Sequence, residues 1–225
     1  MGGGEFPPDR RLTLRKATLA DLDDLTTVAQ AGFPDDPEFD YRFPFRHEFP
    51  EDNRYWVHQE YREYLEQPDK YAVVVITAED NDNRPVALSV WDLNVTIPHQ
   101  GGDLGIPDDD SRVPRRHDAN PSHFREFARR MTQGFQDFFG ALGHDQIHLW
   151  LLCTSPAFRR RGAGTQLCRW GINLAAHQGV HTTVLASPMG KKLYEQLGFV
   201  LNGSFIIQVE GEEAKLEIWA LKKEK

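Results

Sequence analysis

The chain has 225 residues, 40% of them hydrophobic and 27% charged, and a formal net charge of −8. This length supports one sizeable α/β domain with a proper core and is short for two. The negative charge excludes the basic footprint of a nucleic-acid-binding domain. The lack of an apolar run of about 18 residues excludes a membrane span, and only two cysteines argue against a disulfide framework.

The first half of the sequence predicts a strand, two helices and a hairpin. Thr18 with Asp21 three residues later forms a capping box, which opens the first helix, and Pro68 ends the second helix. We interpret residues 34–52, rich in proline, acids and aromatics, as an irregular loop. In chain order we expect a strand at 12–15, a helix from 18, a helix at 54–67 and paired strands at 71–78 and 86–92.

Residues 94–120 lack any hydrophobic period. A stretch of this length in a compact domain is either functional or disordered. We expect it to be a long loop insertion within one domain that covers residues 11–225, and we expect residues 1–10 to form a disordered N-terminus.

The second half predicts an amphipathic helix at 121–142, in which phenylalanines recur at three- and four-residue steps. In the strand predicted at 146–154, strict alternation gives two faces: Ile147, Leu149 and Leu151 on one, and His148, Trp150 and Leu152 on the other. A helix closed by Gly179 follows, and then a strand at 182–186, a short helix at 188–197 and strands at about 205–209 and 215–221. The order β-α-α-β-β-α-β-α-β-α-β-β predicts a mixed α/β sheet of about seven strands with helices on both faces.

The segment 152–164 combines the end of a strand, a glycine-bearing loop and the start of an amphipathic helix. The first amides of a helix lack internal partners and lie at the positive end of its dipole, and Gly162 and Gly164 let an anion approach the backbone. Three arginines beside them add charge and bidentate donors: Arg159, Arg160 and Arg161. The pattern favours a pyrophosphate cradle, although the motif alone fits a solvated arginine turn equally well.

Other ligand motifs are excluded. The loop has no Gly-Lys-Ser/Thr ending, so it is not the loop of nucleotide triphosphatases, and it lacks the full Gly-x-Gly-x-x-Gly run of a dinucleotide-binding strand. The nine histidines and two cysteines show no metal-site spacing, so we expect no metal.

Two segments together resemble the acetyl-CoA motifs of the GNAT superfamily (GCN5-related N-acetyltransferases). The first is Arg-x-x-Gly-x-Gly at 159–164, and the second ends in Leu-Tyr-x-x-x-Gly-Phe at 193–199, about one helix and one strand later. The Ala-Ser-Pro…Gly form at 186–190 is similar to small GNAT proteins common in fungi. A glutamate often found before that alanine is Leu185 here.

The resemblance implies the GNAT acyl-CoA N-acyltransferase fold, in which strands four and five splay apart and the pantetheine arm of acetyl-CoA lies between them. It implies that the Leu152 amide binds the thioester carbonyl, where a donor stabilises developing negative charge. Ser187 either touches the cofactor arm or caps the following helix. The implied cofactor-binding residues are Leu152, Cys153, Thr154, Arg159, Arg160, Arg161, Gly162, Ala163, Gly164, Thr165 and Ser187.

Tyr194 matches the family tyrosine that protonates the departing thiolate, although such a residue can also be a core tyrosine. Our candidate base is His148, since imidazole titrates near neutral pH. Its strand resembles that of arylalkylamine N-acetyltransferases, but Trp150 stands where those carry a second histidine. A hydrogen-bonded histidine without chemistry, with water or a distant acid as base, is an open alternative. A route through an acylated Cys153 is the less favoured alternative, because a buried cysteine more often acts as a small hydrophobic residue.

We therefore expect acetyl transfer from acetyl-CoA to a primary amine, of a small molecule, by direct attack on the thioester. The alternatives are acetylation of a protein lysine or N-terminus, and a non-catalytic acyl-CoA-binding module. By exclusion, residues 33–56 and 94–120 line the acceptor side. We expect no nucleic-acid or membrane partner, a monomer or homodimer, and a location in the cytoplasm, with the nucleus as a second option.

Overall fold

The computed structural model describes residues 11–95 and 116–225. The predicted disorder of residues 1–10 and most of the predicted loop insertion at 94–120 lie outside the described residues. Both stay predictions.

The strands form one mixed sheet. They are β1 (Leu12–Lys16), β2 (Tyr71–Ala78), β3 (Pro85–Asp92), β4 (Gln146–Thr154), β5 (His181–Ala186), β6 (Val200–Gln208) and β7 (Lys215–Lys223). Their order across the seven-stranded sheet is β1-β2-β3-β4-β5-β7-β6. Every neighbouring pair is antiparallel except β4 and β5, which run parallel. The predicted mixed sheet is confirmed.

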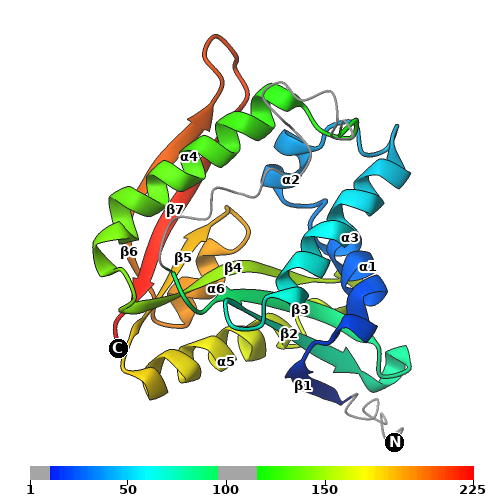
Figure 1. Ribbon diagram of the computed structural model, residues 1–225, viewed down its shortest axis with the longest axis vertical. Coiled ribbons are helices and arrows are strands. Elements are labelled where there is room, and N and C mark those ends of the chain that lie inside the picture. The colour runs from blue at the N-terminus through cyan, green and yellow to red at the C-terminus, as the bar shows by residue number, and fades with distance from the viewer. Residues whose placement is uncertain (1–10, 96–115) are drawn as a thin grey trace, which may run out of the picture.

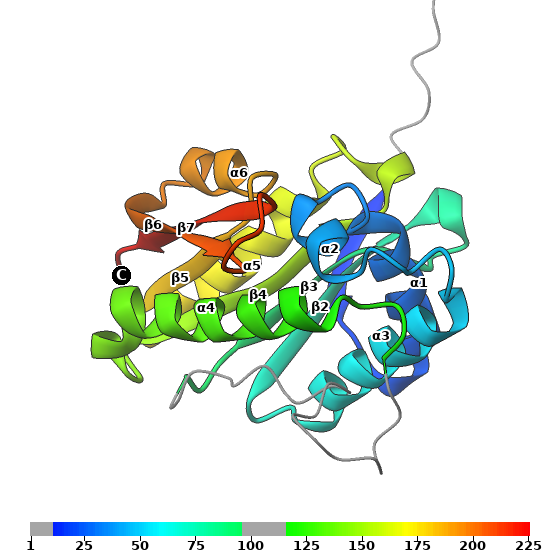
Figure 2. The ribbon, with the colours of Figure 1, turned by 90° about the horizontal axis from the view of Figure 1, so that it is seen from above.

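Helices cover both faces of this sheet. They are α1 (Leu22–Gly32), α2 (Pro37–Arg42), α3 (Pro50–Glu66), α4 (Pro121–Phe139), α5 (Ala163–Gln178) and α6 (Lys191–Gln196). Figure 1 shows α5 on one side of β3 and β4, with α1 and α3 on the other, and α4 along β6 and β7. In Figure 2, α2 lies between α4 and the pair α1 and α3. None of the described helices combines the length and the apolarity that a bilayer span needs.

The interpretation of residues 34–52 as an irregular loop is wrong, because the segment contains α2 and the first turn of α3. Asp36 caps α2 by accepting a hydrogen bond from the Glu38 amide (3.1 Å), and Pro37 takes the first helical position. Phe39 and Tyr41 anchor this short helix by burying their rings. Helix α2 carries Glu38, which lines two of the hollows described below.

A β-bulge at Trp150 overturns the strict alternation predicted for β4. Opposite Leu149 and Leu151 stand two consecutive residues of β3, so Trp150 is the extra residue of the bulge. A bulge adds one residue to a strand and redirects the side chains that follow. Leu152 therefore packs with the cluster on the α5 side, together with Ile147 and Leu149, whereas Leu151 packs with the cluster beside α1 and α3.

Strands β4 and β5 pair only over their first halves. The register runs from Gln146 opposite His181 to Leu149 opposite Val184, whereas β4 continues to Thr154. The second half of β4 pairs with β3 alone, which leaves backbone groups of β4 facing a gap on the β5 side. This is the splay that the resemblance implied.

Helix α5 lies so close to β3 that Gly171 has no room for a side chain. A Cβ atom there would come within 2.3 Å of the ring of Trp91, which is fully buried. We expect Gly171→Ala to lower the free energy of unfolding by about 1–3 kcal/mol, because overpacking shifts the backbone or forces a strained rotamer. Urea denaturation measures the change. The control is Gly140→Ala, whose Cβ would meet only the flexible Gln136 side chain; an equal loss there would show that crowding at Trp91 is not the cause.

Candidate active site

Three hollows share lining residues and run from the gap between β4 and β5 towards α3 and α4. The outer groove, of about 570 Å³, is lined by residues 162–165, Arg160, Lys192 and Tyr194, among others. The inner cavity lies against Phe33, Glu38, Tyr61 and Trp150. The distal lobe is lined by Phe43, Phe124, Phe127, Met131 and His148.

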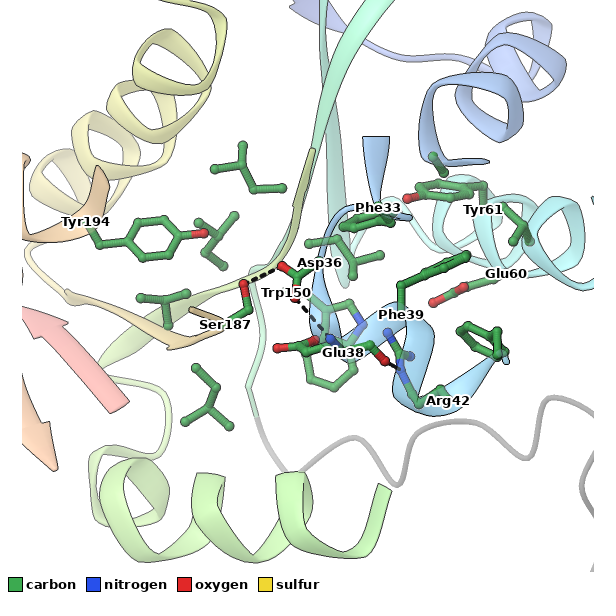
Figure 3. A pocket seen from close by; sticks show the side chains of 18 of the residues that line it. Phe33, Asp36, Glu38, Phe39, Arg42, Glu60, Tyr61, Trp150, Ser187 and Tyr194 are labelled. Carbon is green, nitrogen blue, oxygen red and sulfur yellow. Dashed lines mark hydrogen bonds between the residues drawn. The ribbon is translucent and has the colours of Figure 1, made fainter. Parts of the chain in front are cut away.

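The hollows form one path because the same side chains line successive parts of it. Leu152, Ser187 and Tyr194 belong to both the outer groove and the inner cavity. Glu38 and Trp150 belong to both the inner cavity and the distal lobe. Figure 3 shows Glu38, Trp150, Ser187 and Tyr194 around the inner cavity, with the Tyr194 hydroxyl directed towards it from α6.

The floor of the outer groove is the N-terminus of α5. Gly162 is the residue before the helix and has φ of 87°, in the left-handed region that favours glycine. The amides at 163–165 begin the helix, and such amides have no partner within it. Thr165 and Ala163 also line the groove, as does Gly164. The structure thus brings the predicted residues 162–165 together in the outer groove, whereas Arg161 does not line it.

Arg159 is occupied by protein groups. Its Nε donates to the carbonyl of Thr154 (3.2 Å), and its Nη2 donates to the carbonyl of Gly32 (2.8 Å). Its Nη1 forms an ion pair with Asp35. Arg159 therefore connects the loop to the end of α1 and to the segment between α1 and α2. In this arrangement its guanidinium binds protein groups.

The two following arginines differ from each other. Arg161 pairs with both carboxylate oxygens of Asp80 at 3.1 Å, away from the helix start. Within the described part of the chain, Arg160 forms no ion pair, and neither does Lys192, which sequence analysis did not single out. Arg160 and Lys192 are thus the cations of the outer groove that are available to an anion.

Cys153 contributes to the outer groove, but its side chain is buried beside α1. Its Sγ lies 3.9 Å from the carbonyl oxygen of Val28. Burial raises the pKa of the Cys153 thiol, so the thiol stays protonated at neutral pH. A protonated thiol is a poor nucleophile, which weighs against an acyl-cysteine route.

Tyr194 and Ser187 stand where the outer groove meets the inner cavity. Burial raises the pKa of Tyr194 well above its usual value, so its hydroxyl remains a proton donor at neutral pH. The Ser187 hydroxyl donates to Asp36 at 2.5 Å, and only the main-chain carbonyl of Ser187 accepts from the next turn, at the amides of Gly190 and Lys191. The Ser187 side chain therefore links β5 to α2 and does not cap α6.

His148 is almost fully buried (2% exposed) and lines the distal lobe, one hollow beyond the inner cavity. Gln146 uses its amide nitrogen for two main-chain carbonyls, so its Oε1 accepts from Thr183 (2.8 Å). Thr183 then accepts from Nδ1–H of His148 (2.9 Å). Burial lowers the pKa of His148 to about 3, so the ring is neutral and takes up a proton poorly. His148 as the base stays a prediction.

Glu38 is the residue that sequence analysis missed. It lines both the inner cavity and the distal lobe, and the cap at Asp36 fixes the helix that carries it. Burial raises the pKa of Glu38 to about 7, the Asp36 charge adds to this rise, and Arg42 opposes it. A carboxylate with this pKa is suited to proton transfer near neutral pH.

Two solved structures with the same fold come from insects. A mosquito arylalkylamine N-acetyltransferase-like protein (like 5b) is 14% identical, with TM-score 0.64 and coverage of 95% of this chain and 99% of that one. A Drosophila melanogaster polyamine N-acetyltransferase is 13% identical, with TM-score 0.65 and coverage of 96% and 100%. These identities show the fold alone.

Sequence comparison gives the family. The model of the acetyltransferase (GNAT) domain matches residues 129–201. An acetyltransferase of Stachybotrys chartarum (strain CBS 109288 / IBT 7711) is 29% identical over 216 residues, with 92% of this chain and 89% of that protein covered. Residues 129–201 thus match the acetyltransferase (GNAT) domain, and the chain is similar over most of its length to an acetyltransferase. The resemblance seen in the two sequence motifs is thereby confirmed.

Segments outside the family match contribute part of the walls of the inner cavity and distal lobe. Phe33, Phe39 and Phe43 line the inner cavity from the aromatic segment 33–56. From the C-terminal part of the predicted loop, Arg116 lines both hollows, and residues 96–115 of that loop lie outside the described residues. Arg116 is itself paired with the buried Asp118 (2.8 Å).

A chain of hydrogen bonds lies in the wall that the inner cavity and distal lobe share. The Trp150 indole donates to the hydroxyl of Tyr64 (2.8 Å), which donates to a carboxylate oxygen of Glu60 (2.9 Å). Glu60 lines the same two hollows as Glu38. The bulge thus places the Trp150 indole, which its hydrogen bond to Tyr64 fixes, in the same hollows as the carboxylates of Glu38 and Glu60.

Proposed function

We propose that this protein is an acetyl-CoA-dependent N-acetyltransferase that acetylates a primary amine of a small molecule by direct attack on the thioester. The observation that carries the proposal is the continuous path from the outer groove, past Tyr194, to Glu38 in the inner cavity. Proton donor and proton acceptor line the same hollow, as an uncharged nucleophile and a protonated leaving group require.

The outer groove fits acetyl-CoA. Its floor offers the free amides of the α5 N-terminus beside Gly162, and Arg160 and Lys192 add positive charge. The gap between β4 and β5 leaves backbone groups beside Leu152 for an extended arm. Acetyl-CoA supplies an activated acetyl thioester, and this geometry would orient that thioester towards the inner cavity.

The inner cavity and distal lobe suit a small amine. Aromatic rings contribute to the walls of both, and Glu38 and Glu60 attract an ammonium group. Glu38 then takes a proton from the amine nitrogen, which frees its lone pair for attack. The hydroxyl of Tyr194 donates to the sulfur of the leaving thiolate. The activities in the names of the two insect neighbours, on arylalkylamines and polyamines, support an amine acceptor of this size.

The alternatives receive less support. A protein lysine needs an open groove, whereas Glu38 lies within a hollow bounded by Phe39, Phe43 and Trp150. A non-catalytic module would not need an acid and a base around one cavity. A monomer or homodimer, a cytoplasmic location and a single domain over 11–225 stay predictions.

Replacing Gly162 tests the cofactor assignment. We expect Gly162→Ala to weaken CoA binding at least tenfold, because a Cβ disfavours the positive φ that holds the loop. Isothermal titration with CoA measures this. The matched control is Gly179→Ala at the other end of α5, where φ is 69° and the surroundings are equally open. Similar losses of CoA affinity in both variants would contradict the assignment.

An acceptor screen tests the function. Free-thiol release from acetyl-CoA is followed over arylalkylamines, polyamines, amino acids and lysine peptides. We expect turnover with at least one small amine and none with peptides. Turnover restricted to peptides, or thiol release independent of any amine, would overturn the proposal.

A further inference from the structure

Asp36 occupies the point where the outer groove opens into the inner cavity, and it lines both hollows. One carboxylate oxygen accepts the hydroxyl of Ser187 at 2.5 Å, and the other accepts the amide of Glu38 at 3.1 Å. Figure 3 shows the link from Ser187 to Asp36 beside the cavity. A single side chain therefore joins the end of β5 to the first turn of α2.

The neighbouring residue is anchored as well. Asp35 pairs with Arg159, and the same guanidinium binds the carbonyl of Gly32. The connection between α1 and α2 is thus fastened to the phosphate loop by Asp35 and to β5 by Asp36. These contacts fix the first turn of α2, which carries Glu38, to residues that line the outer groove.

We propose that Asp36 is a positioning residue for the reaction: it fixes Glu38 in the cavity and places a negative charge beside the Glu38 carboxylate. The inference rests on the proposed function, in which Glu38 is the base. Ser187 holds the Asp36 carboxylate in place, so the arrangement spans the donor and acceptor parts of the site.

Asp36 is not the only charged group that acts on Glu38. The Asp36 charge raises the pKa of Glu38 in addition to burial, and Arg42, one turn along α2, lowers that pKa. Other polar or titratable groups that line the same two hollows come from α3, β4, α6 and residue 116: Glu60, Tyr61, Tyr64, His148, Tyr194 and Arg116. Arg116 is compensated by Asp118, and His148 is neutral, so Asp36 and Arg42 are the opposing influences on Glu38.

Two substitutions at Asp36 separate geometry from charge. Asp36→Asn keeps an oxygen that can cap α2, and its amide nitrogen can donate to the Ser187 hydroxyl, but the charge is removed. Asp36→Ala removes both. Asp40→Asn is the matched control, since Asp40 is an exposed acid of the same helix that pairs with Arg46 and lines none of the three hollows.

The experiment is a carbon-13 NMR titration of the Glu38 carboxyl group, assigned with Glu38→Gln, in each folded variant. We expect the wild-type midpoint near 7, a midpoint lower by about one pH unit in Asp36→Asn, and no change in Asp40→Asn. The pH profile of kcat/KM follows the same shift, and Asp36→Ala additionally raises the KM of the acceptor.

The outcomes distinguish the two proposals. An unchanged Glu38 midpoint in Asp36→Asn would overturn the role of Asp36, whatever the enzyme acetylates. A shifted midpoint together with full activity of Glu38→Gln would instead leave the Asp36 charge effect in place and refute Glu38 as the base. If Asp36→Ala fails to fold, the titration of Asp36→Asn, which keeps the cap, still decides the role of Asp36.

Discussion

Glu38→Gln is expected to lower kcat by about 10²–10⁴-fold, the range typical of a lost general base. Glutamine preserves the length and polarity of the side chain but cannot take a proton from the amine. The affinity for CoA should stay unchanged, because Glu38 lines the inner cavity and distal lobe and not the outer groove. Steady-state thiol release and calorimetry measure the two quantities.

The pH dependence of kcat/KM is a second test of Glu38 as the base. The base must be deprotonated to work, and the pKa of Glu38 is raised to about 7. For the wild type, kcat/KM should therefore rise as pH increases through 7 and level off above it, and Glu38→Gln should lack this limb. Glu66→Gln, at the exposed end of α3, is the control. Full activity in Glu38→Gln with a large loss in His148→Gln would transfer the role of base to His148.

Tyr194→Phe is expected to lower kcat by about 10²-fold or more, the lower limit for a lost general acid. The ring remains packed against Gly190 and Phe199, so the fold and the outer groove should persist. Only the hydroxyl that protonates the leaving sulfur is removed. The dissociation constant for CoA should change little, and burst or single-turnover kinetics assign the loss to the chemical step.

The control for this substitution is Tyr55→Phe, an exposed tyrosine of α3. Its turnover should equal that of the wild type. Equal turnover for Tyr194→Phe as well would remove the tyrosine from the mechanism and leave protonation of the thiolate to water or Ser187.

The sequence was sufficient for the sheet, because its strands and helices follow local rules. The apolar runs of β2 and β3, the period of α4 and the Asn120 cap, whose side chain accepts the amides of Ser122 and His123, are all encoded within a few residues. The phosphate loop is likewise local, since a strand, glycines and a helix start follow each other directly. Such features can be predicted without knowing the packing.

Three other features depend on packing between distant segments. The bulge at Trp150 is a mismatch between β4 and β3, which strict alternation along one strand does not reveal. The partners that occupy Arg159 lie in the segment between α1 and α2. The raised pKa of Glu38 follows from burial that only the folded chain creates. The cap at Asp36-Pro37 was a usable signal for α2, but the aromatic residues around it obscured the helix.

A crystal structure with CoA tests the central claim most directly, namely that one path joins donor and acceptor. We predict the pyrophosphate at the amides of residues 163–165 and the sulfur between Leu152 and Tyr194, facing the cavity that holds Glu38. A CoA molecule bound elsewhere, or a sulfur directed away from that cavity, would contradict the account.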